Sequence, residues 1–123
     1  MKLLKKITAK IREIKKSHLR SPQWDRLRDD YIEKYPTCAA CGGMESLQVH
    51  HRKPFHLHPE LELNEGNLIS LCMGEHNCHL NIGHGDSFKC YNPDVTTDSA
   101  HFRLASPIER KFLTENAKKK RLS

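Results

Sequence analysis

Two pairs of cysteines constrain the fold of this 123-residue chain more than any other feature. Cys38 and Cys41 form a Cys-x2-Cys pair beside two glycines, and Cys72 and Cys78 form a second pair further along. Four thiolates suit tetrahedral zinc, which joins two chain segments and compensates for the modest core of a small domain. The alternatives are a disulfide, four buried thiols, or His76 in place of Cys78 as the fourth ligand. We expect structural zinc, because the first residues, MKLLKKITAKIREIKK, lack the apolar segment of a secretion signal.

The composition is that of one polar domain and excludes a membrane span. Hydrophobic residues make up 37% of the chain and charged residues 29%, and the mean hydropathy is -0.73. No segment approaches the roughly 18 consecutive apolar residues that cross a bilayer. We therefore expect a cytoplasmic protein without a membrane partner.

Positive charge is concentrated at the two ends of the chain. Residues 1–20 carry a net charge of +7 and residues 110–123 a net charge of +5, whereas residues 21–109 sum to -6. Basic ends on an acidic body commonly bind a polyanion, most often nucleic acid. The alternatives are solvated termini, or packing of the second end on the body through Phe112, Leu113 and Leu122. The basic residues that we predict to contact DNA are Lys15, Lys16, Lys118, Lys119, Lys120 and Arg121.

Hydrophobic spacing predicts two short strands between helices. Residues 1–20 show the pattern of a basic amphipathic helix, of the kind that lies on DNA, on an anionic membrane or against a partner helix. A second helix is expected from Ser21-Pro22 to Tyr35. Short strands are expected at 47–51 and 67–71, a helix from Asn77 to Gly83 or Gly85, and a final helix over 107–121. Residues 86–108 show mixed turn signals, and the predicted fold class is α+β.

Histidines and one asparagine interleave with the cysteines in the segments CAACGG, LQVHHRKPF, EGNLISLC and CHLNIGHG. In order and separation, these segments resemble the HNH endonucleases of the His-Me finger, or ββα-metal, superfamily. The resemblance covers residues 36–93, and PFHLHPELEL with GHGDSFKCYNPDV looks most like the small HNH proteins of bacteriophages and prophages. It implies a ββα-metal finger with flanking helices, stapled by a four-cysteine zinc site, in a protein encoded by a phage or prophage.

The resemblance also implies a role for each residue. His51 is the general base that activates water, and Asn67 pins the loop between the strands and so orients that base. A divalent metal, held on the scissile phosphate, neutralises developing charge. The expected catalytic residues are His50, His51 and Asn67, the ligands of the catalytic metal are His50, His79 and His84, and the zinc ligands are Cys38, Cys41, Cys72 and Cys78.

Elementary chemistry agrees with an imidazole site and raises two geometric questions. Imidazole has a pKa near ~6.5 and can act as a base at neutral pH, and it favours Zn²⁺, Ni²⁺, Mn²⁺ or Co²⁺ over Mg²⁺, which prefers oxygen. Adjacent strand residues such as His50 and His51 point to opposite faces, so the strand must bend for both to reach one phosphate. His79 and His84 are about 140° apart around an α-helix. Either the helix ends at Gly83 and His84 folds back, or a π-turn realigns the two histidines.

We therefore expect a metal-dependent endonuclease that nicks or cleaves double-stranded DNA and leaves 5′-phosphate and 3′-hydroxyl ends. The nuclease domain would span residues 21–108, between a basic arm at 1–20 and a basic tail at 109–123. Two other functions fit the same sequence: a non-catalytic, zinc-stabilised nucleic-acid-binding module, and an accessory subunit of a phage packaging machinery. The remaining histidines, among them His18, His56, His58 and His101, are expected to be surface or packing residues.

Overall fold

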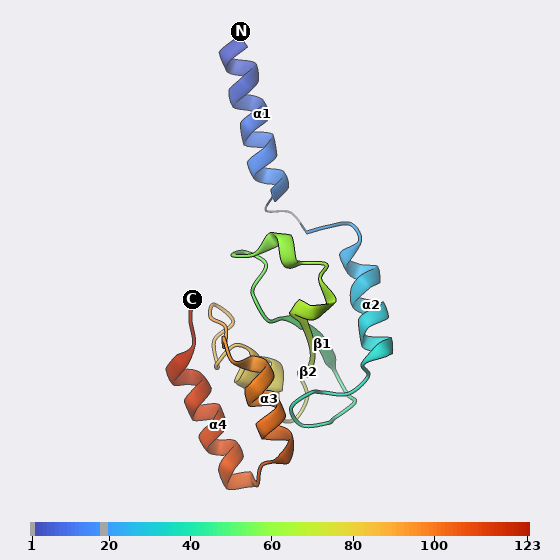
Figure 1. The fold of residues 1–123 in the computed structure, drawn as a ribbon, viewed down its shortest axis with the longest axis vertical. Coiled ribbons are helices and arrows are strands. Elements are labelled where there is room, and N and C mark those ends of the chain that lie inside the picture. Colours follow the sequence, from blue (N-terminus) through green and yellow to red (C-terminus); the bar gives the residue numbers. More distant parts are fainter. Residues whose placement is uncertain (1, 18–19) are drawn as a thin grey trace.

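The computed structural model describes residues 2–17 and 20–123 and consists of a short β-hairpin with helices on both sides (Figure 1). Its strands are β1 (Leu47–His51) and β2 (Leu68–Cys72), and its helices are α1 (Lys2–Ser17), α2 (Trp24–Lys34), α3 (Val95–Leu104) and α4 (Pro107–Lys120). Three short helical turns are η1 (Pro59–Leu61), η2 (Glu65–Asn67) and η3 (His79–Gly83). The described chain is therefore of the α+β class that the sequence predicts.

The hairpin places its two adjacent histidines on opposite faces. β1 and β2 are antiparallel, with His50 opposite Ile69 and His51 opposite Leu68. Because strand side chains alternate, Val49 and His51 face α2, where Val49 joins a small apolar cluster and the His51 ring lies 4.5 Å from that of Trp24. The His50 ring faces η3 instead. The alternation expected for a regular strand is thus present in the fold.

Two apolar clusters hold the hairpin between its helices. On one face, Tyr31 of α2 packs against Val49 and Leu68, and the Tyr31 hydroxyl donates to the Leu68 carbonyl at 3.0 Å. On the other face, Leu71, Ile82 and residues of α3 form the larger cluster, which also encloses three cysteines. Figure 1 shows α2 on one side of the strands and α3 with α4 on the other.

The C-terminal helix belongs to the folded body. Ser106 caps α4 through a reciprocal capping box with Glu109, which fixes where the helix begins. Ala117 is completely buried, and Leu113 packs against the larger cluster. Beyond the helix, Leu122 exchanges two backbone hydrogen bonds with Tyr91, at 2.7 and 2.9 Å. The helix expected over 107–121 is therefore present, and it packs on the body. Of the three side chains expected to pack, Leu113 does so, whereas those of Phe112 and Leu122 are exposed.

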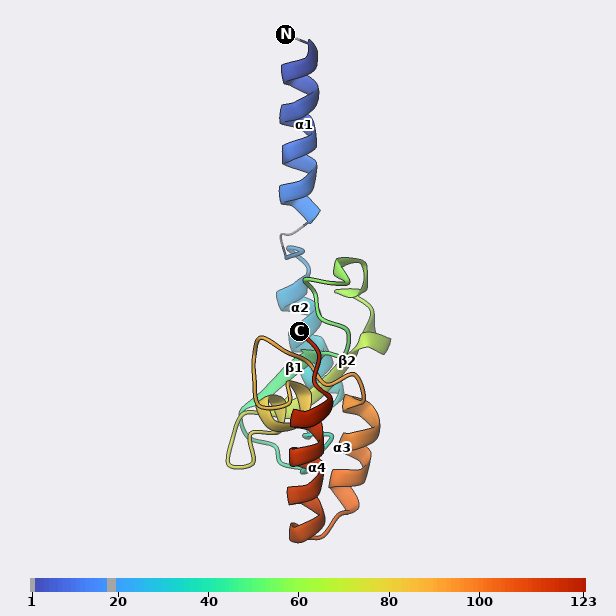
Figure 2. The same cartoon turned by 90° about the vertical axis from the view of Figure 1, so that its left-hand side faces the viewer.

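α1 lies apart from the body and extends away from it in both views (Figures 1 and 2). It is the basic helix expected near the start of the chain. Lys15 and Lys16 fall within α1, but their side chains lie outside the described residues, as does His18 entirely. Among the described residues, no helix has the length and apolar content needed to cross a bilayer.

Three local predictions differ from the structure. α2 begins at Trp24 and not at Ser21-Pro22, because Ser21 forms a preceding turn in which its hydroxyl accepts from the Gln23 amide at 3.1 Å. The helix expected from Asn77 is only the single turn η3. Residues 95–104, where the sequence shows turn signals, form the whole of α3.

Candidate metal centres and the pocket beside them

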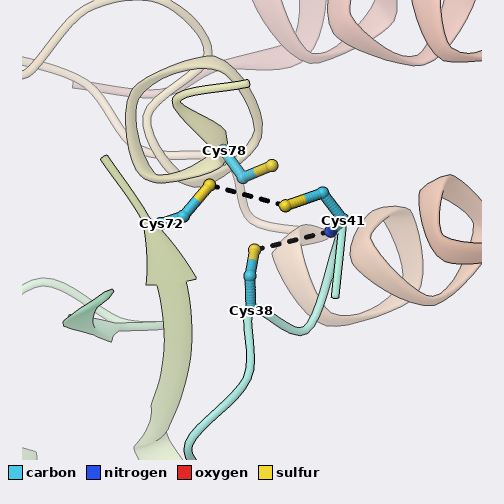
Figure 3. Close-up of side chains that lie close together, drawn as sticks. All are labelled: Cys38, Cys41, Cys72 and Cys78. Atoms are coloured by element: carbon cyan, nitrogen blue, oxygen red, sulfur yellow. Dashed lines mark hydrogen bonds between the residues drawn. The ribbon is translucent and has the colours of Figure 1, made fainter. Parts of the chain in front are cut away.

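Four cysteine side chains converge on one point between the hairpin and η3 (Figure 3). Cys38 and Cys41 come from the turn before β1, Cys72 ends β2, and Cys78 immediately precedes η3. The four sulfur atoms lie within 4.8 Å of one another, and the Sγ atoms of Cys41 and Cys72 are 3.6 Å apart. Four Zn–S bonds of about 2.3 Å in a tetrahedron place the sulfurs about 3.8 Å apart. The cluster therefore fits a structural zinc ion.

The turn around Cys38 and Cys41 has the features of a metal-binding knuckle. The amide of Cys41 donates to the Cys38 sulfur at 3.5 Å, and that of Gly43 donates to the Cys41 sulfur at 3.4 Å. Gly42 has a φ of +78°, which L side chains rarely adopt. A hydrogen bond from the Cys78 thiol, opposed by burial and assisted by backbone amides, lowers the pKa of Cys38 to about 4. The surroundings thus favour the thiolate form, which zinc binds, at Cys38, whereas burial raises the pKa of Cys41.

The structure distinguishes Cys78 from His76 as the fourth member of the cysteine cluster. Cys78 is buried within the cluster. His76 is exposed, and its ring lies beside that of Phe102 at 6.4 Å. Cys90 lies outside the cluster. The set of four that the sequence predicts is therefore the set that the structure brings together.

Three histidines form a second cluster next to the first. His50 comes from β1, and His79 and His84 come from the beginning and the end of η3. One ring nitrogen of each lies within 4.8 Å of the others. The amide of His84 donates to the carbonyl of His79 at 3.1 Å, which is the five-residue spacing of a π-turn. Of the two arrangements that the sequence leaves open, the π-turn is therefore the one adopted.

The ring nitrogens of this cluster are arranged as metal ligands. His84 Nδ1 donates to the carbonyl of Cys90 at 2.7 Å, which leaves the lone pair on Nε2, 3.1 Å from His79 Nε2. Two Zn–N bonds of 2.0–2.1 Å at a tetrahedral angle separate their nitrogens by about 3.3 Å. His50 Nε2 is buried and has no hydrogen-bond partner among the described residues. A metal ion is the group that fits this set of nitrogens.

Burial keeps all three rings neutral. It lowers the pKa of His79 to about 4, and it lowers the pKa values of His50 and His84 as well. The neutral ring is the form that binds a metal ion. A side chain at Gly83 would place its Cβ 3.2 Å from His50 Cε1, so the absence of a side chain lets η3 approach β1 closely.

His51 has the hydrogen bonding expected of a base. Its Nε2 lies 3.0 Å from the backbone carbonyl of Glu62. Because a carbonyl only accepts, Nε2 carries the proton, and the neutral ring presents its lone pair at Nδ1. Burial lowers the pKa of His51, so the ring is neutral at pH 7.

Asn67 ties together the loop that leads from His51 back to β2. Its Oδ1 accepts from the Lys53 amide at 2.9 Å, and its Nδ2 donates to the carbonyls of Lys53 and Leu61 at 3.1 and 3.4 Å. These are the contacts of a residue that pins this loop. The catalytic roles of Asn67, His50 and His51 stay predictions.

Both faces of β1 reach one pocket, because the pocket lies at the end of the strand. This pocket of about 310 Å³ is lined by His50 and His51 together with His79 and His84. His50 and His51 therefore border the same pocket although their side chains point to opposite faces of β1. The bend expected from the sequence is not required for both rings to border the same space.

Several residues that build this pocket carry no signal in the sequence. Glu62 is buried, accepts from the Ser21 amide at 2.9 Å and lies 3.5 Å from Arg20, whose guanidinium sits over the Phe55 ring. Phe88 packs against the rings of His79 and His84. The sequence around Glu62 and Phe88 does not predict these contacts, because each contact joins residues that no local pattern relates.

The predicted DNA contacts in the tail are mostly engaged with the body. Lys118 pairs with Asp86 and Glu115, and Arg121 donates to the carbonyl of Gly85 at 2.8 Å. Lys120 lies 2.7 Å from Asp98 and 3.1 Å from Asp94. Lys119 is exposed. A DNA-binding role for any of these residues stays a prediction.

Comparisons with protein-family models, with curated proteins and with solved structures find no match to this chain. The structure itself supplies a small α+β fold with a four-cysteine cluster suited to zinc and a histidine cluster suited to another metal.

Proposed function

We propose that this protein is a metal-dependent HNH endonuclease that hydrolyses phosphodiester bonds in double-stranded DNA. One observation carries the proposal: His51, neutral and bonded through Nε2 to the Glu62 carbonyl, borders the same pocket as three histidines arranged as metal ligands. A base beside a cationic centre is the combination that phosphodiester hydrolysis requires, because an anionic phosphate repels nucleophiles.

The second metal cluster differs from a structural zinc site in its number of ligands. It offers three imidazoles among the described residues, whereas structural zinc takes four protein ligands. An open coordination position is the property of catalytic metal sites, where substrate oxygen or water binds. The imidazole set favours Zn²⁺ or Ni²⁺ over Mg²⁺.

The residues of the pocket divide the reaction between them. His51 accepts a proton from water at Nδ1 while its Nε2–H stays bonded to the Glu62 carbonyl, so the ring keeps its orientation. The water oxygen bonds to phosphorus, the bond to the 3′ oxygen breaks, and that oxygen takes a proton from solvent. The chemistry supplied by a divalent metal in the histidine cluster is neutralisation of charge on the phosphate and on the leaving oxygen. The products carry 5′-phosphate and 3′-hydroxyl ends.

Residues before and after His51 in the sequence hold its ring in place. The Trp24 ring lies 4.5 Å from the His51 ring, and Asn67 fixes the loop that carries the Glu62 carbonyl. Arg20 adds a half-exposed positive charge to the pocket wall. A phosphate entering this pocket would therefore meet one fixed cationic side chain in addition to the metal.

The test is cleavage of supercoiled plasmid in Mn²⁺, Ni²⁺ or Mg²⁺, with EDTA as the metal-free reference. We expect His51→Ala to lower the cleavage rate by about 10²–10⁴-fold, the usual contribution of a general base. The matched control is His101→Ala, which removes an exposed histidine of α3 outside this pocket.

Circular dichroism and DNA binding of both variants accompany the assay, because His51 also packs on Trp24. A folded His51→Ala protein that keeps more than about a tenth of the wild-type rate would falsify the assignment of the base. A wild-type protein that binds DNA but cleaves it in none of the three metals would favour the non-catalytic binding module instead.

A further inference from the structure

The carbonyls at the end of η3 are held by one buried asparagine. Asn92 is completely buried, its backbone amide donates to the Gly83 carbonyl at 2.9 Å, and its Nδ2 donates to the Ile82 carbonyl at 3.0 Å. A single helical turn leaves its last carbonyls without partners inside the turn. Asn92 thus supplies donors to the last two carbonyls of the π-turn, immediately before His84.

The orientation of Asn92 is fixed by two further bonds. Its second Nδ2 hydrogen goes to Asp98 at 2.8 Å, and its Oδ1 accepts from the Asp94 amide at 2.9 Å. Both hydrogens and the carbonyl oxygen of the side chain are therefore used. If the Asp98 carboxylate moved, Asn92 would lose the acceptor that aims its amide at the π-turn.

The Asp98 carboxylate is buried and depends on a cation from α4. Its side chain is only 7% exposed, and Lys120 Nζ lies 2.7 Å away. A buried carboxylate that loses its cation is left with an uncompensated charge, and any movement towards water alters the bond to Asn92. A continuous chain of contacts therefore runs from α4 through α3 to the turn that carries two of the three histidines.

We infer that Lys120 is a positioning residue for the histidine metal cluster, acting through Asp98 and Asn92. The inference rests on the proposed metal site. It assigns to Lys120 a role inside the protein, where the charge pattern of the sequence predicts a contact with DNA. The Lys120–Asp98 pair could instead serve only to join α3 and α4, and the experiment must separate these two roles.

Close packing of α4 on the same loop supports the inference. Gly85, directly after His84, has a φ of +59°, and a Cβ there would lie 2.7 Å from the Ala117 carbonyl oxygen. Arg121 donates to the carbonyl of that glycine. α4 therefore touches the histidine-bearing segment directly, as well as through the buried polar chain.

The experiment compares Lys120→Met with two matched controls. Lys119→Met removes one exposed positive charge from the same helix. Arg110→Met breaks a different α3–α4 contact, in which Arg110 donates to the Phe102 carbonyl at 3.0 Å and lies over the Phe102 ring, without touching Asn92. For each protein, with zinc in the four-cysteine site, we would measure Ni²⁺ affinity by calorimetry, the melting temperature, and amide hydrogen exchange at His84 without Ni²⁺.

We expect Lys120→Met to weaken Ni²⁺ binding by up to about 10-fold, the lower end of the cost of removing a group bonded directly to a ligand, and to speed exchange at His84. The controls should bind Ni²⁺ within about twofold of wild type, even if Arg110→Met melts earlier. Equal Ni²⁺ affinity and equal His84 exchange in Lys120→Met and Arg110→Met would overturn the inference.

Two other results are possible: the variant does not fold, or wild type does not bind Ni²⁺. If Lys120→Met does not fold, Asp98→Leu takes its place, since it keeps a similar branched shape and removes the acceptor of Asn92. Unchanged affinity and exchange there would overturn the inference. If wild type binds no Ni²⁺ at the histidine cluster, the histidines are not a Ni²⁺ site, and the cleavage assay in Mn²⁺ and Mg²⁺ decides the proposed function separately. The exchange rate at His84 in the metal-free variants then still decides whether Lys120 holds the turn.

Discussion

The cysteine cluster and the histidine cluster are built from the same segments of chain, yet they face different surroundings. Each takes residues from the region around β1 and from the region between β2 and η3. Three of the four cysteines are at most 3% exposed and lie inside the larger core cluster, whereas the histidines form part of the wall of a pocket. A four-ligand cluster enclosed in the core suits a structural metal ion, whereas a three-ligand cluster at a pocket wall leaves a coordination position open.

The cysteine cluster can position the histidine cluster because the two clusters share adjacent residues of the chain. Cys78 directly precedes His79, so zinc bound to Cys78 would fix the beginning of η3. Asn92 fixes its end, next to His84. A single π-turn with so few internal hydrogen bonds has little stability of its own, and both of its ends are therefore anchored from outside.

The strongest test of this comparison is removal of one cysteine. We expect Cys38→Ser or Cys41→Ser to lose the zinc and unfold the body, because the binding energy of structural zinc, about 10–16 kcal/mol in small zinc-finger peptides, is folding energy. Metal analysis and thermal melting followed by circular dichroism measure both effects. Cys90→Ser, outside the cluster, is the control and should keep its zinc. Wild-type melting curves for both cluster variants would show that the thiols do not hold the fold.

The second test removes one histidine ligand and leaves the zinc site intact. We expect His84→Ala to weaken Ni²⁺ binding about 100-fold or more, beyond what an outer-shell partner contributes, with zinc still bound. His76→Ala is the matched control, because His76 is also close to the cysteines but is exposed and lies beside Phe102. Calorimetric titration of each variant gives the answer. Weaker binding in His76→Ala than in His84→Ala would mean that the ligand set is wrong.

The sequence predicts the parts of these sites that depend on short spacing. The Cys-x2-Cys pair, the two strands and the alternation of His50 and His51 follow from local rules of turns and strands. The five-residue separation of His79 and His84 leaves two arrangements for this segment: a helix that ends at Gly83 with His84 folded back, or a π-turn. The partners that hold the end of the π-turn and the ring of His84, Asn92 and the carbonyl of Cys90, lie further along the chain.

What the sequence does not predict depends on partners far apart in the chain. α3 carries a buried Asp98 and a buried Ser99 in place of an apolar stripe, so its periodicity is weak. The contacts of Lys120 with Asp98 and of Arg121 with the Gly85 carbonyl are of this kind, and the predicted DNA contacts of both residues stay predictions. A run of basic residues in the sequence does not show which of its members pair with acidic groups of the body.

The last test has the smallest effect on the fold, and it separates the two basic ends. Residues 1–17 carry seven Lys and Arg on a helix that extends away from the body, whereas the charges of α4 are largely engaged with it. If half of those seven residues contact phosphates, deleting 1–17 should flatten the slope of log K against log salt by about 3, at about 0.9 for each contact. Lys119→Ala should change that slope by no more than about 0.9.

Melting temperature shows whether each end acts as an arm or as structure. Deleting 1–17 should leave it nearly unchanged, because α1 lies apart from both apolar clusters. Deleting 107–123 should lower it strongly, because that deletion removes the buried Ala117, the contact of Leu113 with the core and the cation of Asp98. DNA affinity at three salt concentrations, measured beside thermal melting, gives both quantities. An unchanged salt slope after deletion of 1–17 would place the phosphate contacts on the body, with Arg20 at the pocket as the first residue to substitute.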